Sequence, residues 1–415
     1  MAIEIVEYMP GMAIGKGFDT VRRDVKVSPA VTGSITPPVG ATGQTGQFSL
    51  VLVNGSEEFE ESLGINSSVN GGWGSFSASA KFDFKKKCKV SKQATFCVLS
   101  FSATNAFESF IDPNLTPDAE DLLRLSDMDR FRQRFGDRFI SGWATGGEFF
   151  GSVRIESEST EKQTDIALQV KASFGRLFDA SGGFDKSAAE KISKESLEIF
   201  VMQTGGSIAP VFNLQDLYDT AVKAAKDIEK GRGVPFSVIL ESYDELKLPG
   251  DNISFVQQQH AKEVMRKLGE HYNKLLEFQN DIDFVLRNQN FFEKPDGRKL
   301  NDANQKITDD LNTIAESADR CVRDFSQCQH FTPRIPEINL PPRKQLKPKR
   351  AVVGIKPTRA VVNLNALQAF QLRRQAASVT AQAAILAKSP TTAQDSLRYK
   401  QFAAKLLNQA KKLES

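Results

Sequence analysis

Histidine is scarce in this chain, and its scarcity limits the possible chemistry. The 415 residues include three histidines, His260, His271 and His330, all beyond residue 250. A Ser-His-Asp or Cys-His nucleophile and a histidine-bound metal are therefore excluded from the first 250 residues. The glycine-rich start lacks P-loop spacing, because the fifth residue after Gly11 is Lys16. We expect no catalytic residues, no metal and no cofactor, and we predict that the protein is not an enzyme.

Long apolar runs are also missing. No stretch approaches the roughly 18 residues that a transmembrane helix requires. The N-terminal residues MAIEIVEYMPGM have neither a basic region nor an uninterrupted apolar core, so we expect no secretory signal peptide. The sequence predicts a protein that is made in soluble form, with any membrane span formed later from water-compatible segments.

Cysteine is too infrequent, at four in 415 residues, to form a disulfide framework. Cys88 and Cys97 flank a short lysine-rich stretch and could pair in an exported protein. Cys321 and Cys328 lie two turns apart on a predicted helix, about 10 Å along its axis. That separation is too large for a disulfide unless the helix breaks. Four free thiols are the favoured interpretation.

The net charge of +3 conceals an uneven distribution. Residues 340–415 contain 15 Lys/Arg and 2 Asp/Glu, so the preceding residues are net acidic. A basic block of this kind usually contacts nucleic acid, an anionic lipid surface or an acidic partner. The alternative is a solvated basic extension with no partner.

The first 250 residues mix strand-like and helical patterns. Thr116-Pro117-Asp118 predicts a helix start, with Thr116 as the N-cap and Pro117 at the first helical position. Long strands combined with a few helices indicate the α+β class. The predicted strands are 48–53, 75–84, 95–101, 148–156, 165–174 and 196–202.

Beyond residue 250 the pattern becomes helical. Apolar residues follow a 3–4 spacing from Met265 to Leu286 and again from Ile307 to Phe325, with a turn at 294–297 between them. Two long antiparallel helices are expected, either as a structural hairpin or as a surface for a partner or for oligomerisation. Six prolines then mark a linker. The predicted domains are 1–250, a helical hairpin at 251–330, a proline-rich basic linker at 331–363 and a basic helical tail at 364–415.

One short peptide carries a family resemblance. Phe135-Gly136-Asp137-Arg138-Phe139 is followed, after six residues, by Gly146-Gly147. The arrangement resembles the signature of the membrane-attack-complex/perforin (MACPF) family, within the MACPF/cholesterol-dependent-cytolysin superfamily. That signature is an aromatic-Gly-Thr/Ser-His-aromatic run with a Gly-Gly at the same distance. Asp137 and Arg138 replace the usual Thr/Ser-His, and we expect them to form a local ion pair.

Further motifs follow the family's order over about residues 10–250. They are Gly15–Asp19, Leu115–Asp118, the pair Gly205-Gly206, and Pro235–Tyr243, which is similar to the family's closing strand. The resemblance implies a bent, twisted antiparallel central sheet flanked by two helical clusters, which unfurl into long β-hairpins in a membrane. We expect Gly146, Gly147, Gly205 and Gly206 to be hinge or close-packing positions.

Two stretches have the polarity that a membrane hairpin needs. A hairpin in lipid must belong to a closed barrel, with strands of about 9–11 residues that alternate apolar and polar side chains. An ordinary half-buried sheet alternates for the same reason. The lysines after the first stretch are expected to contact anionic headgroups, at about 1 kcal/mol each. The residues are Phe76, Ala78, Ala80, Phe82 and Phe84, then Ile166, Leu168, Val170, Ala172 and Phe174 as membrane-inserting positions, and Lys85, Lys86, Lys87 and Lys89 as lipid contacts.

These features predict a perforin-like pore-forming toxin. It would be a monomer in solution that binds a lipid membrane, assembles into a ring or arc of identical subunits and inserts two hairpins per subunit. Export or release by a non-classical route would bring it to a target-cell membrane. One alternative is a non-lytic binding or adhesion module of the same fold. Another is binding of nucleic acid or an acidic partner through the tail.

Overall fold

The structure is a computed structural model that describes ten stretches of the chain. These are residues 4–35, 45–65, 79–174, 183–190, 192, 197–207, 209–229, 233–248, 256–333 and 339–344. All of them belong to one compact unit, residues 1–346. Phe76, Ala78, most of the predicted linker and the whole predicted tail lie outside the described residues. The domain boundaries therefore stay predictions.

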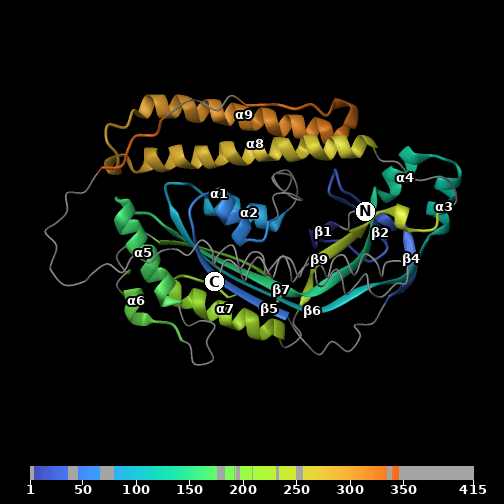
Figure 1. The fold of residues 1–415 in the computed structure, drawn as a ribbon, viewed down its shortest axis with the longest axis horizontal. Coiled ribbons are helices and arrows are strands. Elements are labelled where there is room, and N and C mark those ends of the chain that lie inside the picture. Colours follow the sequence, from blue (N-terminus) through green and yellow to red (C-terminus); the bar gives the residue numbers. More distant parts are fainter. Residues whose placement is uncertain are drawn as a thin grey trace, which may run out of the picture. The chain divides into compact units, whose positions relative to one another are not determined.

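Four antiparallel strands pair with one another in chain order across one part of the sheet (Figure 1). They are β5 (Thr45–Val53), β6 (Thr95–Leu115), β7 (Arg138–Ile155) and β8 (Leu197–Thr204). At one end of the sheet, Val53 pairs with Phe96, Thr95 with Ile155, and Ile155 with Leu197. All four strands therefore share this end, which we call the root end. The strands predicted at 48–53, 95–101, 148–156 and 196–202 are confirmed.

The strand β7 changes its partner halfway along. From Phe139 to Gly146 it pairs with β9, and from Glu148 onward it pairs with β8. The remaining strands have eight residues or fewer, and they complete a nine-stranded sheet within the described residues. They are β1 (Glu4–Glu7), β2 (Lys16–Asp19), β3 (Asp24–Pro29), β4 (Val31–Ile35) and β9 (Val234–Glu241).

Helices from two connections cover opposite faces of the four-stranded region (Figure 1). Successive residues of β6 point to opposite sides, as the pleat of a strand requires. Val98 therefore packs with one helical layer and Leu99 with the other. The first layer contains α1 (Ser56–Ser62) and α2 (Ala80–Cys88), between β5 and β6. The second contains α5 (Thr160–Ser173) and α6 (Lys186–Glu190), between β7 and β8, together with α7 (Leu214–Glu229).

The strand predictions at 75–84 and 165–174 are wrong for this structure. Residues 80–88 and 160–173 are helices α2 and α5. Each begins with a serine N-cap, because Ser79 Oγ accepts from Phe82 N–H at 3.4 Å and Ser159 Oγ from Lys162 N–H at 3.2 Å. In α5 the buried side chains include Ile166 and Val170, a spacing of four that a helix places on one face.

The predicted helical hairpin is confirmed. It consists of α8 (Val256–Arg287) and α9 (Gly297–Arg323), which run antiparallel beside the α1–α2 layer (Figure 1). Asp296 caps α9 by accepting from Lys299 N–H at 3.2 Å. The predicted helix start at Thr116 is also confirmed, as α3 (Pro117–Arg124), and α4 (Met128–Phe135) follows it. None of the described helices is long and apolar enough to cross a membrane.

Candidate functional site: the signature junction and the two segments

The signature peptide lies at the boundary between α4 and β7. Phe135 is the last residue of α4, and Gly136 ends that helix with φ 75°. A side chain at Gly136 would collide with the backbone of Phe18, so this position requires glycine for both conformation and space. Phe135 and Phe139 are both fully buried, in one hydrophobic cluster at this boundary between α4 and β7.

A second motif, Gly15–Asp19, interlocks with this peptide. Phe18 forms a parallel bridge with Gly136, and Asp137 N–H donates to Phe18 C=O at 3.0 Å. A Cβ at Gly17 would overlap the carbonyl of Phe135. Close contact between the two backbones therefore explains the glycines in both motifs. We call the set Gly15–Asp19, Phe135–Phe139 and Tyr243 the signature junction.

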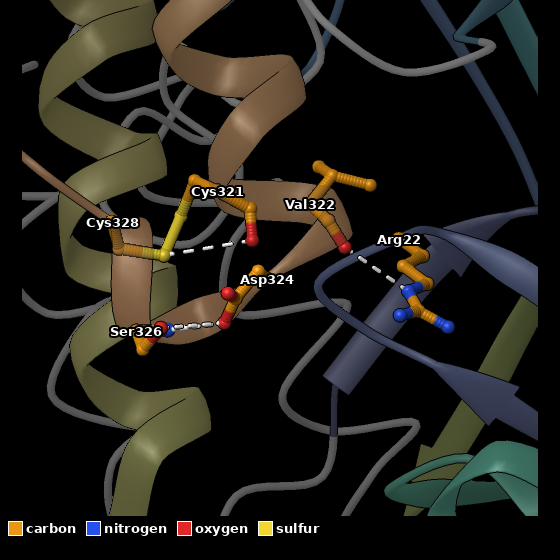
Figure 2. The surroundings of a disulfide bond; sticks show 6 residues. All are labelled: Arg22, Cys321, Val322, Asp324, Ser326 and Cys328. Carbon is orange, nitrogen blue, oxygen red and sulfur yellow. Dashed lines mark hydrogen bonds between the residues drawn. A yellow bond between two sulfur atoms is a disulfide. The ribbon is translucent and has the colours of Figure 1, made fainter.

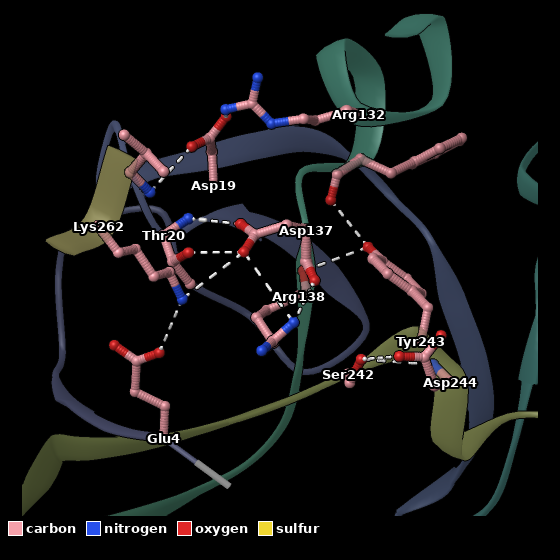
Figure 3. Close-up of polar contacts among 12 residues, drawn as sticks. Glu4, Asp19, Thr20, Arg132, Asp137, Arg138, Ser242, Tyr243, Asp244 and Lys262 are labelled. Atoms are coloured by element: carbon pink, nitrogen blue, oxygen red, sulfur yellow. Dashed lines mark hydrogen bonds and ion pairs between the residues drawn. The ribbon is translucent and has the colours of Figure 1, made fainter. Parts of the chain in front are cut away.

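Asp137 is buried at the centre of the signature junction (Figure 3). Its carboxylate accepts from Thr20 N–H at 2.6 Å and from Thr20 Oγ1 at 2.6 Å. Lys262 Nζ lies 3.8 Å from Asp137 Oδ2, and Arg138 Nη1 lies 4.0 Å from it. The expected Asp137–Arg138 ion pair is thus present but long, and Thr20 is the closer partner.

Tyr243, at the end of the closing-strand motif, completes the signature junction. Its buried hydroxyl donates toward the carbonyls of Phe135, at 2.8 Å, and Arg138, at 3.2 Å (Figure 3). Burial raises the pKa of this hydroxyl well above its usual value, and the nearby Asp137 carboxylate adds to the rise. The neutral hydroxyl is therefore a stable donor at any physiological pH.

The signature junction also binds the helical hairpin. Asp19 Oδ2 accepts from Arg132 Nη2 at 2.8 Å, and the Arg132 guanidinium lies 3.8 Å from the ring centroid of Phe325. Arg22 Nε donates to Val322 C=O at 3.1 Å (Figure 2). From α8, Lys262 Nζ reaches Glu4 Oε2 at 3.4 Å. The signature therefore lies where the sheet meets the end of α9 and the start of α8.

A disulfide shapes the end of α9 at this contact (Figure 2). The helix ends at Arg323, and a 3₁₀ turn at Phe325–Gln327 brings Cys328 back until its Cα is 4.3 Å from that of Cys321. The prediction of free thiols is therefore wrong for this pair, because the helix breaks between them. Cys88 and Cys97 are free, as expected, and burial raises the pKa of each thiol to about 12.

One pair of glycines lies within β7 and the other directly after β8. Gly146 has φ 151°, and a Cβ there would overlap the carbonyl of Ala103. A Cβ at Gly147 would lie 2.5 Å from Ile228 Cδ1. These two residues mark the point where β7 exchanges β9 for β8. Gly205 and Gly206, with φ 79° and 69°, form the turn after β8.

The two connections at the root end have equal length. We call residues 54–94, between β5 and β6, the first segment, and residues 156–196, between β7 and β8, the second segment. Of the predicted inserting positions, Ala80, Phe82 and Phe84 are in α2. Ile166, Leu168, Val170 and Ala172 are in α5, and Phe174 is its C-cap. The fold thus brings both predicted stretches to opposite faces of the same four strands.

The four lysines predicted to contact lipid have three different environments. Lys85 Nζ is buried and lies 2.5 Å from Glu60 Oε1, so its expected contact with lipid headgroups is wrong for this conformation. Lys86 Nζ lies 5.5 Å from the ring centroid of Tyr272 on α8. Lys87 and Lys89 are exposed, and their lipid contact stays a prediction.

The helix α8 holds the first segment by a row of polar contacts. Asp281 Oδ1 accepts from Ser91 Oγ and from Lys92 N–H, both at 2.7 Å. Asn280 Nδ2 donates to Val90 C=O at 2.9 Å, and Glu277 Oε1 accepts from Ser56 N–H at 2.9 Å. On the sheet side, Lys81 pairs with Glu148 at 2.9 Å. The first segment is therefore bound on both sides by bonds that would have to break before it could extend.

Metal chemistry finds no support in the described part of the chain. No group of three or more His, Cys, Asp or Glu side chains there could hold a metal ion. The rings of His260 and His330 lie 6.4 Å apart, on α8 and after α9. The features that distinguish this site are close backbone packing, buried hydrogen bonds and ion pairs, and two segments joined to one sheet.

Comparisons with known proteins give likenesses of fold alone. No protein-family model and no curated protein matches the sequence. The solved structure of stonustoxin is 14% identical over 79% of this chain and 44% of that chain, with a TM-score of 0.46. GNIP1Aa from Chromobacterium piscinae is 14% identical over 57% of this chain and 52% of that chain, with a TM-score of 0.33. A Bacteroides thetaiotaomicron protein with a MAC/Perforin domain is 14% identical over 54% and 55%, with a TM-score of 0.26.

This chain spans roughly half the length of those proteins. Its own antiparallel sheet and the two helical segments on opposite faces are the arrangement that the signature resemblance implies. The described fold therefore agrees with the one expected from the resemblance to the MACPF signature. The fold class predicted from the sequence, α+β with a bent antiparallel sheet and flanking helical clusters, is confirmed.

Proposed function

We propose that the protein forms pores, by binding a membrane, assembling with further copies and converting the first and second segments into β-hairpins. One observation carries the proposal. Both segments join neighbouring antiparallel strands at the same end of the sheet, so each could extend as a continuation of its two flanking strands. The extended strands would keep the existing pairing direction, and copies side by side would close the backbone hydrogen bonds.

The length of the segments fits this conversion. Each segment contains about 40 residues. Two strands that cross a bilayer need about 9–11 residues each, so about half of each segment is sufficient for the crossing. The remaining residues would extend the hairpin outside the lipid and form its turn.

The polarity of the segments supports it as well. In extended form Phe82 and Phe84 alternate with Lys81, Asp83 and Lys85, although the helix α2 now hides part of that pattern. Period-two alternation is not needed in a short helix, whose buried face requires a spacing of three to four. A sequence that satisfies both periods is suited to two conformations.

The test uses an engineered disulfide for each segment. Ser91→Cys with Asp281→Cys would tie the first segment to α8, and Thr95→Cys with Gln163→Cys would tie α5 of the second segment to β6. The side chains of each pair are now hydrogen-bonded, at 2.7 and 2.9 Å. Dye-loaded phosphatidylcholine vesicles, with and without phosphatidylserine, would report permeabilisation. We expect each oxidised variant to be inactive and each reduced variant to recover leakage.

Wild-type protein under the same reducing conditions is the control, because Cys321–Cys328 would also be reduced. Leakage by both locked variants at the wild-type rate would refute the proposal. Binding without leakage by the wild type would instead favour the non-lytic binding module. One feature favours the non-lytic function: the buried Lys85–Glu60 ion pair, which stabilises α2 in its helical conformation.

A further inference from the structure

Arg343 lies where three parts of the molecule meet. Its Nη1 donates to Ser157 C=O at 3.0 Å and to Gln163 Oε1 at 3.3 Å. Its Nη2 donates to Gln93 C=O. Gln93 belongs to the end of the first segment, whereas Ser157 and Gln163 belong to the start of the second. A single guanidinium therefore binds both segments, next to the start of β6, into which the first segment leads, and the end of β7, from which the second segment leaves.

A hydrogen-bonded chain extends this contact across the root end. Gln163 Nε2 donates to Thr95 Oγ1 at 2.9 Å, and Thr95 Oγ1 donates to Asn54 Oδ1 at 2.9 Å. Asn54 is the first residue of the first segment, and Thr95 directly follows its last. Gln163 and Thr95 are buried, so water does not readily replace these bonds. Both ends of the first segment and the start of the second are thus linked to Arg343.

The hairpin, rather than either segment, holds Arg343 in position. The guanidinium lies 5.3 Å from the ring centroid of Phe284 and 5.8 Å from that of Phe292. Neighbouring backbone bonds add to this support, because Lys344 N–H donates to Phe291 C=O at 2.8 Å and Glu293 N–H to Pro342 C=O at 2.9 Å. The strap formed by residues 339–344 is therefore anchored on the α8–α9 turn and reaches from there to both segments.

We propose that Arg343 is a positioning residue that couples the two segments, so that neither can leave the sheet without loosening the other. This inference rests on the proposed function, since it assigns the contact that keeps both hairpin precursors closed until insertion. A guanidinium can hold several acceptors at once in a fixed plane, which a lysine ammonium cannot do in the same geometry. Replacing it should free the backbone carbonyls of both segments together.

Amide hydrogen exchange of the full chain, without lipid, tests the coupling directly. In Arg343→Lys we expect exchange to accelerate about tenfold to a hundredfold at residues 93–95 and at 157–166. That range is what the loss of one or two charge-assisted hydrogen bonds implies. Exchange at the signature junction, residues 135–139, should not change. Unaltered exchange at either segment, or faster exchange at one segment alone, would overturn the coupling.

Two further variants keep the test decisive. Lys344→Met changes the adjacent charge, but its Nζ contacts the hairpin alone, at Asn290 C=O, so both segments should exchange as in the wild type. Gln163→Leu alters the second segment and should nevertheless accelerate exchange at residues 93 and 94 of the first segment and at the adjoining Thr95. If Arg343→Lys fails to fold, the Gln163→Leu result decides: no change at 93–95 would refute the linkage.

Vesicle leakage separates this inference from the proposed function. With phosphatidylcholine–phosphatidylserine vesicles, Arg343→Lys should shorten the lag before leakage relative to the wild type and Lys344→Met. Faster exchange in a protein that never causes leakage would uphold the coupling while refuting pore formation. Leakage with identical lag in all three proteins would show that Arg343 does not control release.

Discussion

Tyr243 connects the closing-strand motif to the signature peptide through one hydroxyl group. Replacing it with phenylalanine keeps the ring in its buried cluster but leaves the carbonyls of Phe135 and Arg138 without this donor. We expect Tyr243→Phe to lower the free energy of unfolding by about 1–3 kcal/mol, measured by urea denaturation. Tyr218→Phe is the matched control, because its ring packs on Phe184 and its replacement should cost less than about 0.5 kcal/mol. Equal losses of unfolding free energy in the two variants would show that the hydrogen bonds of the Tyr243 hydroxyl do not stabilise the fold.

Asp281 makes the hold of α8 on the first segment depend on pH. Burial raises the pKa of its carboxyl above the usual value near 3.8, against the opposing bonds from Ser91 and Lys92. The folded state therefore binds a proton more tightly than the unfolded state. The tighter proton binding stabilises the folded state. This stabilisation is fully present below about pH 4 and is lost as pH rises through the raised pKa.

Asp281→Asn removes that dependence while its side-chain oxygen can still accept both bonds. The free energy of unfolding of the variant, minus that of the wild type, should rise between about pH 4 and the raised pKa and then become constant. Denaturation at a series of pH values measures it. Parallel curves for the two proteins would contradict the assignment of the shift to burial of this carboxylate.

Among the elements, β7 depends on glycine where it changes partner. A methyl group at residue 147 would lie against Ile228 and the backbone of Thr204, in a region with no free space. We expect Gly147→Ala to lower stability by about 1–3 kcal/mol, as overpacking does. Gly183→Ala is the control, since nothing lies within 4 Å of a Cβ there. Thermal unfolding of both variants checks this, and a stable Gly147→Ala protein would rule out close packing as the reason for glycine.

The elements also show which features of the fold were predictable from sequence. Strands 48–53 and 148–156 are rich in β-branched and aromatic residues, and the α8–α9 hairpin has apolar residues at helical spacing. At 165–174 alternate residues are apolar, which predicts a strand. Ile166 and Val170 also satisfy helical spacing, and the N-cap at Ser159 favours the helix. The signature junction could not be assembled from sequence, because Thr20 and Asp137 meet across 117 residues.

Contacts of single side chains were also beyond the sequence. The lysine cluster suggested a cationic surface, yet Lys85 is buried against Glu60, a partner 25 residues earlier. The Cys321–Cys328 disulfide depends on where α9 ends, which the apolar spacing did not define. The sequence did not point to Arg343, because its acceptors are largely backbone carbonyls, which every residue type provides.

At the scale of the whole molecule, the distribution of charge predicts how the protein meets a membrane. Residues 347–415 contain 13 Lys/Arg and 2 Asp/Glu. A lysine or arginine near an anionic leaflet contributes about 1 kcal/mol, and salt screens the attraction. A chain that ends at residue 346 keeps the Arg343 contacts and the whole described unit. It should therefore unfold at the same temperature as the full chain.

Binding to phosphatidylserine-containing vesicles should then differ between the two chains. The full chain should bind more tightly at low salt and lose that advantage as ionic strength rises, whereas the shortened chain should bind weakly at every salt concentration. Sedimentation with vesicles measures both. Competition by a DNA duplex at equal phosphate concentration would distinguish nucleic-acid binding from lipid binding. Equal, salt-independent binding by the two chains would place the membrane contact within residues 1–346, where the exposed Lys87 and Lys89 are the first positions to replace.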